Sequence, residues 1–386
     1  MTNAQPNRHG PLKDVRVIDL TAMVMGPYAT QILADLGADV IKVEPPEGDN
    51  TRYISSGPER GMCGVYVNVN RGKRSVMLDL RSDQGKAQLR ELIAGADVFV
   101  HSMRASAIAK LGFAYPEVAA IRPDIVYVNG YGYGRRGRYG NLPAYDDTIQ
   151  AECGIPDLQE KMTGEPGFAG TIMADKISGL HVLYATLAAL YHRATTGEGQ
   201  EVEVPMFESM ASFMLVEHAN GALFDPPQGP AYYPRAVAKN RRPYKTKDGH
   251  VAALIYNDKH WANFVAAVQP EWATPEMNDF EQRARIIDSI YGQLAETFAQ
   301  RTTAEWLELL TANQIPCAPL RTTAELMTDP HLEEVGFFET VDSAIGTQRL
   351  PGLPVWFSKT PGGVQGPTTR LGADAEAVFA ELAAKS

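Results

Sequence analysis

Cysteine is scarce in this sequence: three of its 386 residues are cysteines, Cys63, Cys153 and Cys317, and no two of them form a CxxC pair. That number and spacing support neither a disulfide framework nor a zinc site, and they suit a reducing cytoplasm. Long apolar runs are also missing, since no stretch approaches the ~18 consecutive apolar residues of a membrane span. Residues 1–20 lack the apolar segment of a signal peptide. The sequence therefore predicts a cytoplasmic protein with no metal site and no membrane partner.

Basic residues are in deficit, because 36 Lys and Arg residues face 46 Asp and Glu residues, for a formal net charge of −10. This balance argues against a nucleic-acid partner. Two local basic clusters run against the trend: Lys73 with Arg74, and Arg135 with Arg136 and Arg138. Each cluster is either solvated loop charge or a site that holds a small polyanion.

A chain of this length exceeds the roughly 250–300 residues that one hydrophobic core serves, so we expect two domains. Its first half alternates strands with helices, which predicts a parallel α/β sheet covered on both faces. The predicted strands span 15–20, 39–44, 74–80, 97–102 and 124–132, and the helices span 27–38, 84–96 and parts of 106–120. Ligands of such sheets bind beyond the carboxyl ends of the strands, which places the loops after Leu20, Glu44, Ser102 and Gly132 at the candidate site.

The clearest linker is the proline-rich segment 225–234, which has no apolar periodicity. After it come a predicted hairpin across Asp248 and Gly249 and predicted helices near 259–268, 281–300 and 303–313. We therefore expect a large α/β domain over 1–224, a smaller α+β domain over 225–325, and a C-terminal segment over 326–386 that returns to the large domain.

One common signature is present but incomplete. Residues 132–137, "GYGRRG", match GxGxxG after a predicted strand, whereas Walker A, HExxH and GxSxG motifs are absent. A dinucleotide fingerprint must also open a helix, and here "RYGNLPAYDD" intervenes. We therefore expect a flexible loop whose arginines face an anion, and no nicotinamide site.

Asp175 is the one acid within "TIMADKISGLHVLYATLAAL", residues 171–190. Aspartate caps helix N-termini well, so a structural role is one interpretation. The other is a nucleophilic carboxylate. The glycine-rich segment before it would allow a ligand to approach the backbone closely, and helix amides would favour the ionised form. A helix to about Arg193, expected to be buried nearly all round, would limit access of water.

Four blocks of the sequence, in order, carry a resemblance to a known family. They are "VIDLTAMVMGPYATQILADLGADVIKVEPPEGDNTR", "NRGKRSVMLDLRSDQG", "LPAYDDTIQAECG" and "ADKISGLHVLYATLAALYHRATTGEGQEVEVPMFES". With them the chain resembles the class III CoA-transferases, the family of formyl-CoA transferase, carnitine CoA-transferase and α-methylacyl-CoA racemase. The resemblance implies a Rossmann-like parallel-sheet large domain, a smaller α+β domain and an interlocked homodimer.

The resemblance also implies a reaction and a set of site residues. CoA passes from an acyl-CoA thioester to a carboxylic acid through an aspartyl anhydride and an aspartyl-CoA thioester, with no tightly bound cofactor. The catalytic positions are Asp175, Tyr145 and Asp146. The CoA-binding positions are Met23, Met25, Leu78, Arg81, Ser102, Met103, Arg104 and Lys110. At 102–106 this chain reads "SMRAS" where the family often has Asn-Phe-x-Pro-Gly.

Two alternatives to CoA transfer stay open. The first is proton exchange of the racemase type, for which this chain offers Tyr145 and Asn257 where racemases carry histidine and glutamate; neither titrates near neutral pH. The second is a CoA-binding protein without catalysis, in which Asp175 is only a cap. The acid substrate is not readable from the sequence. Four basic residues after the linker either bind its carboxylate or are solvated. They are Arg235, Lys239, Arg241 and Arg242.

Overall fold

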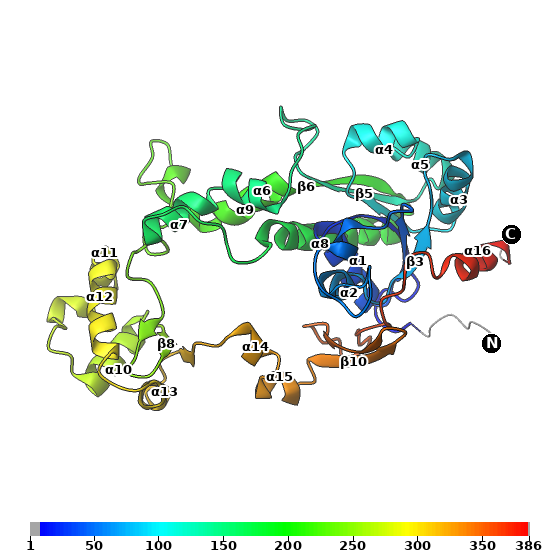
Figure 1. Cartoon of the computed structure of the whole chain (residues 1–386). Helices are drawn as coiled ribbons and strands as arrows, with labels where there is room; N and C mark the ends of the chain where they lie inside the picture. Colours follow the sequence, from blue (N-terminus) through cyan, green and yellow to red (C-terminus); the bar gives the residue numbers. More distant parts are fainter. Residues whose placement is uncertain (1–7, 385–386) are drawn as a thin grey trace. The chain divides into compact units, whose positions relative to one another are not determined.

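The computed structural model describes residues 8–384, and the described chain forms two compact units (Figure 1). The first unit consists of residues 8–153, 169–213 and 331–384, and the second of residues 154–168 and 214–330. The domain limits predicted from the sequence, 1–224, 225–325 and 326–386, stay a prediction.

A six-stranded sheet forms the centre of the first unit, and all of its strand pairs are parallel. The spatial order is β3-β2-β1-β4-β5-β6. The strands are β1 (Arg16–Leu20), β2 (Asp39–Glu44), β3 (Arg74–Met77), β4 (Val98–His101), β5 (Val126–Tyr131) and β6 (Gln200–Pro205). This order is that of a doubly wound Rossmann-like sheet. Strands β2 and β3 are added on one side of β1 and strands β4 to β6 on the other, so the strand order reverses between β1 and β4. The predicted α/β fold class is confirmed.

Side-chain alternation along β1 places one core on each face of the sheet. Val17 packs with Val98, Val126 and the helices α1 (Met25–Asp35) and α8 (Met173–Thr196). Ile18 packs on the opposite face with Phe99 and the helices α3 (Asp83–Ala94), α5 (Tyr115–Ile121) and α16 (Ala375–Ala383). Both faces are covered, as the apolar runs of parallel strands require.

The remaining elements of the first unit surround this core. They are α2 (Gly64–Asn70), α4 (Ala105–Leu111), α6 (Asp146–Glu152), the first part of α9 (Met206–His218), most of α15 (Pro330–Glu334), and the short 3-10 helix η1 (Asn50–Tyr53). Two further strands, β10 (Phe338–Ser343) and β11 (Gly346–Pro351), form an antiparallel hairpin that the sequence reading missed. The C-terminal helix α16 packs beside β3, because Asp374 accepts a hydrogen bond from the Ser75 N–H at 2.8 Å.

Helix α8 is longer and less enclosed than the sequence predicted. It begins at Met173, before Asp175, and it ends at Thr196. The next residue, Gly197, caps the helix with a φ of 79°, the left-handed conformation that glycine adopts freely. Its side facing α1 is tightly packed: a Cβ on Gly179 would lie 2.6 Å from the Met25 carbonyl oxygen. The opposite side is exposed at Tyr184 and Tyr191, so the expectation of a helix buried nearly all round is wrong for the single chain.

The second unit has its own core, built on the side chains of Trp261, Phe264, Phe298 and Trp306. Its sheet has the order β7-β8-β9 and is antiparallel, with β7 (Tyr244–Lys245), β8 (His250–Ala253) and β9 (Cys317–Pro319). The hairpin predicted across Asp248 and Gly249 is confirmed as β7–β8.

Helices make up most of the rest of the second unit. They are α7 (Ile155–Thr163), α10 (Asp258–Val268), α11 (Phe280–Arg285), α12 (Ile287–Phe298), α13 (Thr303–Ala312) and α14 (Thr323–Leu326), with the 3-10 helices η2 (Asn220–Leu223) and η3 (Pro275–Asn278). The single helix expected over 281–300 is two helices, because the backbone at Ile286 leaves the helical region with φ −113° and ψ 22°. Across residues 8–384, no helix has the length and apolar character that crossing a membrane requires.

Candidate active site

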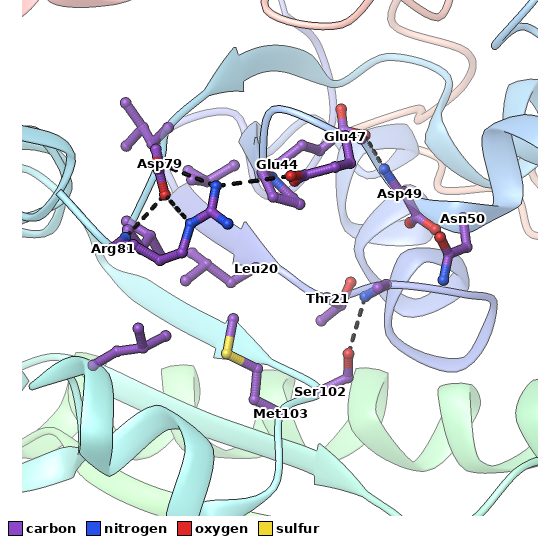
Figure 2. Close-up of a pocket in the computed structure, with 17 residues that line it drawn as sticks. Leu20, Thr21, Glu44, Glu47, Asp49, Asn50, Asp79, Arg81, Ser102 and Met103 are labelled. Atoms are coloured by element: carbon purple, nitrogen blue, oxygen red, sulfur yellow. Dashed lines mark hydrogen bonds and ion pairs between the residues drawn. The ribbon is translucent and has the colours of Figure 1, made fainter.

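The loops that follow β1 and β4 meet at the point where the strand order reverses. The Ala22 N–H, after β1, donates a hydrogen bond of 2.9 Å to Ser102 Oγ, after β4. A cavity of about 550 Å³ opens here, between the loops that follow β1, β2, β3 and β4 (Figure 2). This is the position where ligands bind to doubly wound sheets. Its volume falls within the range of about 300–1,000 Å³ that is usual for ligand sites.

Half of the predicted CoA-binding residues line this cavity. They come from two separate loops, those after β3 and β4, and are Leu78, Arg81, Ser102 and Met103. Figure 2 shows Met103 and Ser102 on one wall, with Arg81 on the other side. Residues distant in sequence are thus brought together by the sheet.

The other four predicted CoA-binding residues do not line the cavity. Met23 lies in the loop after β1 with φ 66°, and its N–H donates to Asp49 Oδ1 at 3.2 Å. Met25 is buried at the start of α1 and contacts α8. Arg104 and Lys110 are exposed on the surface, before and within α4. For these four, a role in CoA binding stays a prediction.

The cavity wall carries more negative charge than the sequence reading expected. The Arg81 side chain is 72% exposed and is already paired, with Nε 2.8 Å from Asp79 Oδ1 and Nη2 3.7 Å from Glu47 Oε1. These acids hold Arg81 over the cavity mouth, but they also compete with any phosphate for it.

Buried ion pairs beneath the cavity fix the loops that form it. Asp49, which lines the cavity, pairs with Lys42 at 3.0 Å, and Glu44 pairs with Arg52 at 2.7 Å. All four side chains are almost fully buried. Asp49 also accepts the Met23 N–H, so one carboxylate links the loops after β1 and β2. The sequence analysis did not single out Asp49. The usable signal was its position as an acid in the loop that follows the predicted strand 39–44.

The first basic cluster, Lys73 and Arg74, is neither solvated nor free for a polyanion. Lys73 is buried, with Nζ 3.1 Å from Asp19 Oδ2, and Arg74 pairs with Asp39 at 2.6 Å. Burial lowers the pKa of Lys73 to about 8 despite the attraction of Asp19. Burial opposes ionisation of Asp19 as well, but Lys73 and Lys42 outweigh it and hold its pKa at about 2. Both alternatives raised for this cluster were wrong.

The second cluster follows β5. No helix opens at Gly132: the next helix is α6, at Asp146, so the glycine pattern lacks the geometry of a dinucleotide site. Arg135 faces two carboxylates of β6, with Nη1 2.9 Å from Glu201 and Nε 3.3 Å from Glu203. The anion that Arg135 faces is therefore a pair of the protein's own carboxylates.

Asp175 is the third residue of α8, and it does not cap the helix. The N-cap is Ile172, and the N-terminus has no side-chain cap hydrogen bond. Among residues 8–384, no group donates a hydrogen bond to the Asp175 carboxylate and no cation pairs with it; only its backbone N–H is bonded, to Asp146 Oδ1 at 3.0 Å. A partly buried carboxylate without a partner is costly to ionise, and such groups concentrate at functional sites.

The surroundings of Asp175 raise its pKa from 3.8 to about 7, first through burial and second through the negative charge of Asp146. The expectation that helix amides would hold this carboxyl ionised was therefore wrong. Near pH 7 the acid and carboxylate forms coexist.

Asp146 contrasts with Asp175 in every contact. It is 7% exposed and starts α6, where it accepts the Asp175 N–H and, at 2.5 Å, a hydrogen bond from Gln150 Nε2. Gln150 also accepts the Ala169 N–H at 2.9 Å, which fastens the segment that leads into α8. The sequence reading missed Gln150, although its i+4 spacing from Asp146 along α6 was a usable signal.

Tyr145 precedes α6 and is 63% exposed, and its catalytic role stays a prediction. The cavity lining contains none of Tyr145, Asp146 and Asp175. The packing of α8 on α1 connects the cavity loops with the region of Asp175. Gly179, one turn after Asp175, contacts Met25 at the end of the β1 loop. Within the described chain, no group of three or more His, Cys, Asp or Glu side chains is placed to bind a metal ion.

The first unit combines a Rossmann-like sheet, a cavity at the point where the strand order reverses, and the Asp175 carboxylate, which has no partner within residues 8–384 and is outside the lining of that cavity. Comparison with known proteins identifies the class of enzyme. The family model described as "CoA-transferase family III" matches residues 12–375. The chain belongs to this family, and the enzyme class predicted from the sequence is confirmed. Acyl-CoA thioesters are the substrates of CoA-transferases, so coenzyme A enters as a substrate group.

Individual relatives match along nearly the whole chain. Succinate–glutarate CoA-transferase of Agrobacterium fabrum is 30% identical, over 98% of this chain and 97% of its own. Acetyl-CoA:oxalate CoA-transferase of Acetobacter aceti is 32% identical, over 97% and 95%. Succinyl-CoA:mesaconate CoA-transferase of Haloarcula hispanica is 32% identical, over 92% of each chain.

Solved structures agree with this assignment. A CaiB/BaiF family protein from Brucella suis superposes with a TM-score of 0.82 and 28% identity, over 97% of this chain and all of its own. The protein Rv3272 from Mycobacterium tuberculosis superposes with a TM-score of 0.81 and 29% identity, over the same shares.

Proposed function

We propose that this enzyme moves CoA from an acyl-CoA thioester to a carboxylic acid, with Asp175 as the covalent nucleophile. The observation that carries the proposal is the isolation of the Asp175 carboxylate: it is partly buried and has no hydrogen-bond donor or cation partner in the described chain. The names of the relatives support the substrate class, because succinate, glutarate, mesaconate and oxalate are all carboxylic acids.

The proposed reaction begins when a carboxylate oxygen of Asp175 attacks the thioester carbonyl carbon. The C–S bond breaks, CoA leaves as the thiolate with the electron pair, and a mixed anhydride remains on Asp175. The thiolate then attacks the aspartyl carbonyl, which releases the first acid and forms an aspartyl-CoA thioester. The acceptor carboxylate repeats the two steps in reverse, leaving Asp175 free and the acceptor joined to CoA.

Both intermediates hydrolyse if water reaches them, so the site must exclude it. Ala174, next to Asp175, is fully buried, and the apolar helix α8 continues behind it. Asp146 and Gln150 act as positioning residues, since they hold the Asp175 backbone and the segment before it. The oxyanion of each tetrahedral intermediate would be stabilised by backbone N–H groups of neighbouring loops.

CoA would bind in the 550 Å³ cavity, with Leu78, Ser102 and Met103 against its neutral part and Arg81 at the mouth. Arg104, which precedes α4, and Lys110, within it, add positive charge for its phosphates. The pantetheine arm would run along the β1 loop, past Met23, toward the first turn of α8.

The two alternatives have weaker support. Racemase chemistry needs an acid–base group at the position where racemases carry glutamate. Here that position is Asn257, an amide that caps α10 by accepting the His260 N–H at 2.8 Å. A CoA-binding protein in which Asp175 is only a cap requires a cap hydrogen bond, and α8 has none from a side chain.

The proposed assembly is the interlocked homodimer implied by the resemblance. It is supported by the apolar side chains that α8 exposes in the single chain: Leu180 at 45%, Tyr184 at 59% and Tyr191 at 73%. Exposed apolar groups in a continuous stripe mark an interaction surface. Light scattering on the purified protein tests this proposal, and a monomer at micromolar concentration would contradict it.

Covalent trapping tests the role of Asp175. The enzyme is incubated with succinyl-CoA or acetyl-CoA and then with hydroxylamine, which converts an aspartyl anhydride or thioester to the hydroxamate. Mass analysis should find the hydroxamate on the peptide that contains Asp175. Asp175→Asn should form none and should lose at least about 10³-fold in transfer rate. Asp157→Asn is the matched control, because Asp157 also lies in a first helical turn but is exposed. Transfer by Asp175→Asn at the wild-type rate would refute the proposal.

A further inference from the structure

A second cavity, of about 200 Å³, lies within the second unit. Its walls come from the segment 233–235, from residues 255–256 after β8, and from the helices α11 and α12. The lining is dominated by aromatic and branched apolar side chains, among them Tyr256, Phe280 and Ile287, and it includes two guanidinium groups. Pockets that combine an apolar body with a few oriented polar groups are typical of small-molecule sites.

Arg235 supplies the free positive charge of this cavity. Its Nε donates a hydrogen bond of 2.8 Å to Tyr291 Oη, and its guanidinium carbon lies 4.6 Å from the centre of the Tyr256 ring. These two contacts fix the plane of the guanidinium. Neither Nη atom has an acceptor within residues 8–384, and no carboxylate of that region pairs with Arg235. An oriented guanidinium with both Nη groups open is a ready partner for a carboxylate.

The second guanidinium is already satisfied. Arg283 is buried, with Nη1 donating to the Met277 carbonyl at 2.8 Å and Nη2 paired with Asp258 at 2.5 Å. It forms part of the wall and leaves Arg235 as the cation that a ligand would meet. The neighbouring Arg242 also donates internally, to the Lys239 carbonyl, and it does not line the cavity.

The size and lining of the cavity limit the ligand. An apolar cavity of about 150 Å³ is large enough for benzene, so 200 Å³ admits a six-membered ring or a branched alkyl chain with one small anionic group. Tyr256 and Phe280, whose rings meet edge to face at 5.4 Å, offer the contact surface for such a body. Inorganic phosphate would satisfy Arg235 but would leave this apolar surface uncovered.

We propose that this cavity binds a small organic acid, with a carboxylate on the Nη atoms of Arg235 and an apolar body against Tyr256 and Phe280. The ligand class is an acid with an aryl or branched alkyl body. This binding is independent of the CoA-transferase function proposed above.

Ligand-detected NMR titration of the full-length protein with 4-fluorobenzoate tests the binding. Arg235→Gln should weaken binding about ten-fold or more. Arg235→Lys should weaken it less, because lysine keeps the positive charge although it lacks the two parallel N–H donors of arginine. Ile287→Trp should block binding by filling the cavity. Arg242→Gln, a change in an exposed arginine of the same segment, should leave it unchanged. Equal binding by wild type and Arg235→Gln, or phosphate binding as tightly as fluorobenzoate, would overturn the proposal.

This test is independent of the Asp175 mechanism, because Asp175→Asn should still bind fluorobenzoate normally.

Discussion

Replacing Asp175 by asparagine should stabilise the protein above neutral pH while abolishing transfer. In the folded chain, burial and the charge of Asp146 raise the pKa of Asp175 from 3.8 to about 7. Since one pKa unit corresponds to about 1.36 kcal/mol, ionising this group in the folded state costs about 4 kcal/mol more than in the unfolded chain. The carboxyl is partly open to water, and screening reduces this to an expected effect of about 2–3 kcal/mol.

The sign follows from where the proton is held. Between pH 4 and pH 7 the folded Asp175 keeps a proton that the unfolded chain has lost, so the wild-type protein loses stability as the pH rises through that range. Asparagine carries no charge at any of these pH values, so the variant escapes this loss. The two proteins should be about equally stable near pH 4, and the variant should be the more stable one above pH 7.

Thermal unfolding of both proteins from pH 4.5 to pH 8.5, at one protein concentration, measures the effect. The relevant quantity is the midpoint of the variant minus that of wild type at each pH, because titration of all other groups cancels in the difference. Asp157→Asn serves as the control and should show a difference that does not change with pH. A flat difference for Asp175→Asn, or a variant less stable than wild type at pH 8, would refute the assignment of an unpaired, raised-pKa carboxyl.

Three further predictions follow from the same geometry. Asp146→Asn removes the second cause of the raised pKa of Asp175, so the acidic limb of the pH profile of kcat/KM should move down by about one unit; an unmoved limb would show that burial alone sets it. Ser102→Ala deletes the hydrogen bond that joins the two cavity loops, and calorimetry should find CoA binding weakened about three- to ten-fold. Gly179→Ala places a Cβ 2.6 Å from the Met25 oxygen and should lower the thermal midpoint, with a cost of about 1–3 kcal/mol; an unchanged midpoint would mean that α1 and α8 separate freely.

The sheet and its ligand edge were predictable because short-range patterns determine them. Continuous apolar runs such as 125–128 are long enough for a strand buried on both faces, and strand–helix alternation makes the sheet parallel. The loops after Leu20, Glu44 and Ser102 were therefore expected at one edge, and the cavity lies there. The hairpin of β10 and β11 was missed, since its strands are half exposed and lack a clean alternation of apolar and polar residues.

The electrostatics of the site were not predictable, because they depend on pairs that are distant in sequence. Lys73 looked like loop charge until the fold placed Asp19 beside it, at a separation of 54 residues. Asp175 was expected to be ionised from its place in a helix, yet the Asp146 carboxylate, brought close by packing of α6 on α8, acts in the opposite direction. Helix position is local information, whereas burial and neighbouring charge come from tertiary structure.

The two aspartates show how one residue type acquires two roles. Asp146 is held by two donors, the Asp175 N–H and Gln150, so its lone pairs are engaged and its charge is fixed in place. Asp175 has no donor of its own, and that fixed charge raises its pKa. A carboxylate bound by strong donors is a poor nucleophile, and one without donors is a better one but is harder to form. A pKa near 7 is a compromise between these demands, because both the acid and the carboxylate form of Asp175 are present at neutral pH.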